Sequence, residues 1–211
     1  MSVLRRTLAT LAVTGLTAAG SVVALTPAPA SADETTTSLA EVLAADGNKF
    51  DRDQKDFDVL DRVVRAVLAA KPDSPVAVLA DGTQTLTAFL PTDQAFRRMA
   101  SDLVGGDAGK NERTAFKSLA GAVDADTLET VLLYHVVVGQ KLDSGIVAES
   151  DGAMIETAQG GDITVNVEGN KITIGDLDPT DTDPRVTVVD INSQANQLGH
   201  AINRVLRPAD L

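Results

Sequence analysis

At residues 86–96 the chain reads Leu86-Thr87-Ala88-Phe89-Leu90-Pro91-Thr92-Asp93-Gln94-Ala95-Phe96, an apolar run followed by a polar turn. The apolar run predicts a buried strand that ends at Leu90, because Pro91 cannot continue a sheet ladder. The hydroxyl of Thr92 can accept from the free amides of a helix that starts there. That helix would bury Ala95 and Phe96. The stretch therefore predicts a strand-to-helix corner in the core.

Two later stretches add to this one. They read Leu133-Tyr134-His135-Val136-Val137, and Val189-Asp190-Ile191 running on to His200-Ala201-Ile202-Asn203-Arg204-Val205-Leu206. In order and spacing the three stretches resemble the fasciclin domain. Residues 87–96 are similar to the first conserved box of that family, residues 132–142 to its Tyr-His segment, and residues 188–208 to its second box, which ends the domain. The resemblance spans Ser38 to Pro208.

Four positions depart from the family pattern. Val138 stands before Gly139 where the family commonly has Pro, and Gln197 replaces the frequent Gly after Asn196. Gly199 replaces an aliphatic residue before His200, and Asn203 replaces an Asp. Residues 46–57 are also longer and more charged than usual. These departures concern local loop geometry and leave the expected fold unchanged.

The resemblance implies an α+β fold, a wedge of about seven strands in two β-sheets with helices packed along one edge. Members of the family are mostly secreted or tethered to a surface, and several mediate adhesion. In animal relatives, integrin contacts have been attributed to an Asp-Ile pair and to the Tyr-His segment. The matching candidates for partner binding in this chain are Asp190, Ile191, Tyr134, His135, Leu132 and Leu133.

Residue patterning independently predicts an α+β class, with helices crowding the first half and antiparallel strands the second. Helices are expected from the capping box at Ser38, over 57–68, over 111–122, and from an Asp126-x-x-Glu129 cap. Strands are expected at 76–79 and 86–90, joined through a hairpin at Asp81-Gly82. Further strands are expected at 163–167, 172–174, 186–191 and 201–206.

The N-terminus has the features of an export signal. Arg5 and Arg6 precede an uncharged apolar run, and Ala30-Ser31-Ala32 matches an A-x-A cleavage site. We therefore divide the chain into a signal peptide at 1–32, a short polar leader at 33–37 and a single domain at 38–208. An uncleaved membrane anchor is the alternative, since the apolar run approaches spanning length. Cleavage leaves a secreted protein without membrane insertion, either free or associated with the cell wall.

Charge and composition restrict the classes of partner. The full chain has a formal net charge of −12; removal of residues 1–32 deletes Arg5 and Arg6 and no acid, which leaves −14. Such acidity disfavours phosphate backbones and anionic lipid, so nucleic acid is excluded as a partner. The chain has no cysteine, so packing alone must hold the fold. We expect a monomer.

Catalytic signatures are not found in the sequence. It contains no G-x-S-x-G elbow, H-E-x-x-H motif, P-loop or dinucleotide fingerprint. Its two histidines, His135 and His200, each lie in an apolar run, which is typical of a core histidine whose ring nitrogens are satisfied. A dispersed hydrolase triad would need one of them beside a serine and a carboxylate. We therefore expect no enzyme activity and no cofactor.

Two acidic stretches are candidates for a calcium site. One is 51–58, where Lys55 replaces a ligand and no glycine supplies the turn of a calcium loop; the other holds Asp176, Asp178, Asp181 and Asp183. Aspartate is also common in turns, where it caps its own backbone. The solvated-loop interpretation is favoured for both stretches, so no metal ligand is assigned.

The sequence as a whole favours a secreted or cell-surface module that mediates adhesion or binds an extracellular protein or glycan without catalysis. The alternative is an extracellular binding protein that holds a small apolar or carbohydrate ligand in an aliphatic pocket. The negative charge favours basic targets, with binding that weakens as salt rises.

Overall fold

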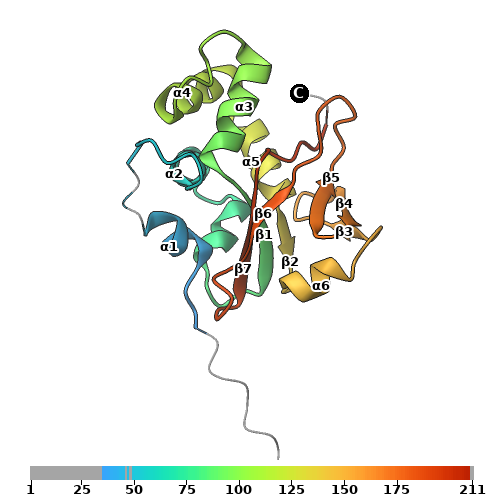
Figure 1. The fold of residues 1–211 in the computed structure, drawn as a ribbon. Helices are drawn as coiled ribbons and strands as arrows, with labels where there is room; N and C mark the ends of the chain where they lie inside the picture. Colours follow the sequence, from blue (N-terminus) through green and yellow to red (C-terminus); the bar gives the residue numbers. More distant parts are fainter. Residues whose placement is uncertain (1–34, 46, 48, 210–211) are drawn as a thin grey trace, which may run out of the picture. The chain divides into compact units, whose positions relative to one another are not determined.

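Strand β1 (Leu86–Pro91) lies inside a four-stranded sheet, and all six of its residues are buried. It pairs antiparallel with β2 (Val136–Val138) and parallel with β7 (Gln197–Ile202). β6 (Val186–Ile191) pairs antiparallel with β7 and forms one edge of the sheet (Figure 1). These contacts come from a computed structural model that describes residues 35–45, 47 and 49–209. The expected signal peptide at 1–32 lies outside the described residues.

The second sheet is antiparallel and has three strands. Its order is β3 (Met154–Glu156), β4 (Asp162–Glu168) and β5 (Lys171–Gly175). Burial alternates along most of β4, where Ile163 and Val165 are buried between more exposed residues. This alternation is the one that the sequence pattern predicts. Seven strands in two sheets are thus present within the described part of the chain, as expected.

All of the described helices precede the second sheet in the chain. They are α1 (Leu39–Ala44), α2 (Asp58–Ala70), the 3₁₀ helix η1 (Pro75–Ala80), α3 (Asp93–Val104), α4 (Glu112–Ala122), α5 (Ala125–Tyr134) and the short α6 (Ser144–Ala148). The capping box predicted at Ser38 and Glu41 is present at the start of α1. The α+β class predicted from the sequence is therefore confirmed.

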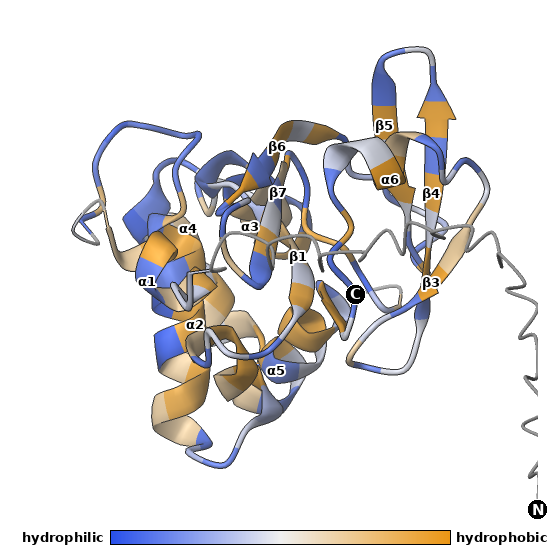
Figure 2. Ribbon diagram, turned by 90° about the horizontal axis from the view of Figure 1, so that it is seen from below, coloured by the Kyte–Doolittle hydropathy of each residue, from blue (hydrophilic) through white to orange (hydrophobic). Residues whose placement is uncertain are grey.

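The two faces of β1 belong to two different hydrophobic clusters. Leu86, Ala88 and Leu90 pack with apolar side chains of α1 to α5, whereas Phe89 packs with Tyr134 and the second sheet. Successive side chains of a strand point to opposite faces, so one strand can divide the core in this way. The hydropathy colouring of Figure 2 shows apolar residues along α1, α2 and α5, where these helices come together.

Two predictions for the segment before β1 were wrong. Residues 76–79 are not a strand, because Ser74 caps a 3₁₀ helix that has Pro75 at its first position and buries Val76 and Leu79. The hairpin through Asp81-Gly82 is accordingly absent from the described fold. A side chain at Gly82 would collide with Thr36, since an added Cβ would lie 1.6 Å from the Thr36 carbonyl oxygen.

Two further errors concern element ends. Helix α5 is capped by Asp124, which accepts from the Thr127 amide at 2.8 Å, two residues before the predicted Asp126. The last strand occupies 197–202 and not 201–206, because its register follows β1 residue by residue. Thr92 does start α3, but its hydroxyl makes no capping hydrogen bond.

Gln197 joins three elements through its side-chain amide, which is fully buried. Its Oε1 accepts from the Leu39 amide at 2.7 Å, and its Nε2 donates to the carbonyls of Val78 at 2.7 Å and Asp81 at 2.8 Å. These bonds satisfy the start of α1 and the end of η1. The departure from the family pattern at this position therefore has a structural role.

Replacement of Gln197 by leucine should lower the free energy of unfolding by about 3 kcal/mol, because buried backbone groups would lose their partners. The matched control is Gln194→Leu, at an exposed position, which should change stability by less than about 0.5 kcal/mol. Urea unfolding of both variants measures the difference. Equal stability of the two variants would show that the Gln197 amide does not hold these elements.

Candidate functional site

Tyr134 closes helix α5 and is completely buried. Its hydroxyl donates to the Asp162 carbonyl at 2.7 Å, which ties α5 to strand β4. Burial, reinforced by the charge of Asp176, raises the pKa of Tyr134 to about 12. Leu132 is also buried, and Leu133 is half-buried against the helical cluster. In this folded state the Tyr-His segment is part of the core and offers little surface to a partner.

His135 is buried, and both of its ring nitrogens are engaged by the backbone. Nδ1 lies 2.7 Å from the Val131 carbonyl, and Nε2 accepts from the Leu206 amide at 2.9 Å. These partners require a neutral ring that carries its proton on Nδ1. Burial lowers the pKa of His135 to about 4.

His200 has the opposite tautomer. Its Nε2 lies 2.7 Å from the Leu142 carbonyl, while Nδ1 faces the Asp190 amide at 3.4 Å. The proton therefore sits on Nε2. Burial lowers the pKa of His200, and the ring packs against Phe89 with centroids 5.9 Å apart. The prediction of satisfied core histidines is confirmed for both rings.

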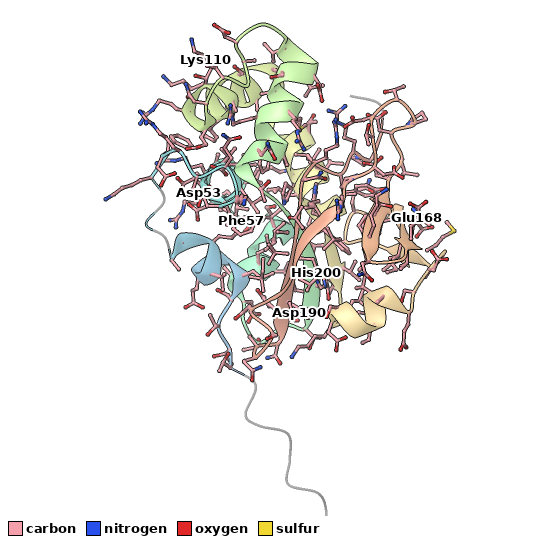
Figure 3. The ribbon with its side chains drawn as sticks, viewed as in Figure 1. Asp53, Phe57, Lys110, Glu168, Asp190 and His200 are labelled. Carbon is pink, nitrogen blue, oxygen red and sulfur yellow. The ribbon has the colours of Figure 1, made fainter. Side chains whose placement is uncertain are left out.

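Asp190 lies beside His200 on the neighbouring strand (Figure 3). Its carboxylate accepts from the backbone amide of Ser144 at 2.9 Å and from the Ser144 hydroxyl, so it holds the start of α6. The hydroxyl of Ser144 therefore points to a carboxylate and not to a histidine. This order of contacts differs from that of a hydrolase triad, in which the histidine receives the serine proton.

The exposed part of β6 lies next to the predicted Asp-Ile pair. Val188 is 53% exposed and Val189 is 41% exposed, whereas Ile191 is half-buried against the helical cluster. The pairing with β7 shifts register twice between Val186 and Ile191, and Asp190 has a φ of 59°. Consecutive exposed valines are a consequence of this irregularity, because regular alternation would turn one of them inward. The sequence pattern did not predict that these two valines would be exposed.

A cavity of about 230 Å³ opens beside Val188. Its walls come from the loop before α2 (Gln54, Lys55), from the start of α3 (Thr92, Gln94) and from β6. A larger hollow of about 590 Å³ is lined by polar and charged side chains, among them Glu168, Lys171 and Arg185. That lining differs from the aliphatic pocket expected for a small apolar ligand.

Two arginines pair with aspartates of the acidic loop after β5. Arg207 is 5% exposed, and it lies 3.2 Å from a carboxylate oxygen of the buried Asp178. Asp181 pairs with Arg204 at 2.6 Å, and Asp102 of α3 lies 3.3 Å from Arg207. Asp178 and Asp181 are therefore paired within the protein, whereas Asp183 is exposed. Asp176 and Asp178 also accept from backbone amides two residues further on, as expected of a turn.

The other acidic stretch, 51–58, has two parts. Asp51 and Asp53 are exposed and accept from backbone amides two residues further on, as expected of a solvated turn. Asp58 is buried, and its carboxylate lies with those of Asp56 and Asp93 in one group whose ligand atoms are all within 4.8 Å of one another. Asp93 comes from a distant part of the sequence, so the spacing of the acidic residues did not reveal this group.

The Fasciclin domain family model matches residues 61–208 of the chain. No curated protein matches at the level of sequence. Among solved structures, a FAS1 domain pair from the insect cell adhesion molecule Fasciclin I is similar, with a TM-score of 0.56 and 16% identity. The alignment covers 81% of this chain and 51% of that one, so this chain spans about half the length of the matched domain pair. None of the described helices combines the length and apolar character needed to cross a membrane.

Acidification should destabilise the fold through His135, because the folded pKa of about 4 lies below the ordinary value of 6.5. Between these values the unfolded chain binds more protons, so stability falls as the pH falls. Between pH 7.5 and pH 5 the contribution is about 2 kcal/mol. In His135→Gln, which does not titrate, this part of the loss should be missing.

Urea unfolding of wild type and His135→Gln at both pH values measures this contribution as the difference between two pH dependences. The difference is needed because buried carboxyl groups with raised pKa, such as Asp176, stabilise the fold on acidification and are common to both proteins. Identical pH dependences would contradict a buried, neutral His135.

Proposed function

Because the chain belongs to the fasciclin domain family, we propose that it is an extracellular or cell-surface module that binds another protein, in adhesion, without catalysis. The exposed edge of β6 is the observation that carries this proposal. Val188 and Val189 present aliphatic surface there, next to the cavity at Thr187. Apolar side chains on an unpaired edge are typical of surfaces that dock a partner.

Backbone groups on this edge favour a protein partner. β6 is hydrogen-bonded to β7 on one side, and its other side is the end of the sheet. An extended segment of a partner can add to such an edge, gaining affinity from backbone hydrogen bonds and specificity from side-chain pockets. The neighbouring cavity of about 230 Å³ would accept one side chain of such a segment.

The six residues suggested by family resemblance have mainly structural roles in this proposal. Tyr134, His135 and Leu132 are buried, and the carboxylate of Asp190 is occupied by Ser144. Ile191 and Leu133 are only half-exposed. These residues fix the position and irregular path of β6, while Val188 and Val189 would make the contact.

The charge of the chain indicates what kind of partner segment would be favoured. After removal of residues 1–32 the formal charge is −14, so a basic partner would be attracted and the association would weaken with salt. Attachment to the cell wall and secretion itself remain part of the proposal, and both follow from the family and the predicted signal peptide.

Substitution of both Val188 and Val189 by lysine should reduce partner binding at least tenfold, since loss of about 1.4 kcal/mol is enough and each buried valine contributes about that much or more. The matched control is Val104→Lys, which changes an equally exposed valine (49%) at the end of α3. Pull-down from a surface extract of the source organism at low and high salt compares the three proteins.

Melting temperatures should be similar for wild type and both variants, because the three valines are on the surface. Proteins retained by wild type and by Val104→Lys, but not by the β6 variant, would support the proposal. Retention by all three proteins would rule out β6 as the contact surface.

A further inference from the structure

Three aspartates, two at the starts of helices and one in a loop, meet at one point in the fold. Asp58 is the first residue of α2, Asp93 is the first residue of α3, and Asp56 lies in the loop that leads into α2. Their potential ligand atoms are all within 4.8 Å of one another. In Figure 3, Asp53 and Phe57 mark the loop that carries Asp56.

Helix capping explains part of this arrangement. Oδ1 of Asp93 accepts from the Val59 amide at 2.9 Å and so caps α2, whose own N-cap residue, Phe57, provides no side-chain acceptor. The Asp93 amide in turn donates to the Asp56 carbonyl at 3.0 Å. These bonds hold the two helix starts together, and the positive ends of both helix dipoles favour negative charge at this point.

Capping does not account for the other oxygens. Asp93 is completely buried, yet its Oδ2 has no hydrogen-bond partner among the described residues. Oδ1 of Asp56 is also buried and has no hydrogen-bond partner among the described residues. Glu112, 2% exposed at the start of α4, also has an oxygen without a partner, Oε2. Buried carboxylate oxygens are costly unless a proton or a cation satisfies them.

Asp56 and Asp93 differ from the aspartates of the other acidic loop in their cationic neighbours. In the acidic loop after β5, Arg204 and Arg207 lie within 4 Å of the aspartates. Asp56 and Asp93 have no such ion pair within the described ranges.

We propose that Asp56, Asp58 and Asp93 bind a hard divalent cation, Ca²⁺, at the junction between the starts of α2 and α3. All three ligands are carboxylates, and neither histidine nor cysteine takes part, which disfavours zinc and copper. Ca²⁺ accepts six to eight oxygens in irregular geometry, so three carboxylates completed by water suit it. Mg²⁺ demands closer octahedral geometry and fits a converging, partly buried set less well.

Solvent can reach this region. Asp56 is half-exposed, and a hollow of about 290 Å³ is lined by Phe50, Asp51 and Glu112. Glu112 is a further acidic side chain near the group: burial raises its pKa, and the charges of Asp51 and Asp58 add to that rise. An approaching cation would therefore meet carboxylates along its path.

Protons are the competing way to neutralise the group. Burial raises the pKa of Asp93 to about 9, and burial together with the neighbouring acids raises that of Asp56 to about 7. A proton held between these two carboxyls would satisfy the orphaned oxygens in the absence of a cation. The experiment must therefore distinguish a cation site from a pair of carboxyls that share a proton.

Thermal unfolding of the full chain, freed of metal with EDTA, tests the proposal. Ca²⁺ at about a hundred times its dissociation constant should raise the melting temperature by about 5 to 10 °C. Mg²⁺ at the same concentration should raise it less, and NaCl of matched ionic strength should not reproduce the effect. Calorimetric titration with Ca²⁺ alone should show saturable binding with one site.

Variants connect the response to these residues. Asp56→Asn should abolish the Ca²⁺-dependent rise and the calorimetric signal, and so should Asp93→Asn, whose amide oxygen can still cap α2. Asp183→Asn, in the other acidic loop and exposed, should keep both. Asp56 caps no helix, so its variant remains informative if Asp93→Asn does not fold.

The outcomes separate the alternatives. A rise that Asp56→Asn removes and Asp183→Asn preserves supports the cation site. No response to Ca²⁺ in wild type, or a response unchanged in Asp56→Asn, overturns it and leaves the proton-sharing pair. An equal response to Mg²⁺ overturns the assignment to Ca²⁺. These results do not depend on binding through β6, so either proposal can fail alone.

Discussion

Two imidazole rings hold the fold together by bonding to backbone groups in the core. His135 joins the last turn of α5 to the segment after β7, and its own carbonyl accepts from the amide of Phe89 in β1 at 2.9 Å. His200 joins β7 to the loop before α6. Each ring serves as donor at one nitrogen and acceptor at the other, which only a neutral imidazole can do. The opposite tautomers follow from the opposite order of donors and acceptors around the two rings.

This structural demand explains why residues associated with contacts in relatives are buried here. A side chain that satisfies the Leu206 amide or the Ser144 amide is not free to engage a partner at the same time. The binding surface that we propose is therefore made of the neighbouring residues that these bonds position. On β6 the exposed pair Val188 and Val189 lies directly before Asp190, whose positive φ and two hydrogen bonds from Ser144 set the course of the strand.

Local patterns in the sequence were sufficient for much of the fold. The strand-to-helix corner, the amphipathic stretch of α2 and the alternation in β4 are set by neighbours in the chain, so they were predicted correctly. The predicted end of the strand at Leu90 was wrong by one residue, because Pro91 still pairs with Ile202 of β7. β7 was misplaced because all six of its residues are buried, including Gln197 and His200, and full burial removes the alternation that marks a strand. Gly199 belongs there because Leu90 fills the space that its side chain would need, 2.6 Å from an added Cβ.

The candidate site was less predictable, because its residues are brought together from distant parts of the sequence. Val188 and Val189 are exposed through a register shift that depends on β7, and the sequence of β6 alone does not encode it. The aspartate group forms only where the starts of α2 and α3 meet, and Asp58 and Asp93 are far apart in the chain. Arg207 compensates Asp178 in a similar way, although strands β6 and β7 separate these two residues in the chain. Long-range packing determines each of these features.

The parallel pairing of β1 with β7 has a consequence for how the chain acquires its structure. Leu86 pairs with Gln197, so about 110 residues must be synthesised before the central strand finds this neighbour. Contacts between distant parts of a chain slow folding, because the loop must close before the contact is gained. Until then the apolar residues of β1 lack one of their covering strands, and an incomplete chain exposes a sheet edge to other chains. Folding of the first half is thus unfinished until the last strand arrives.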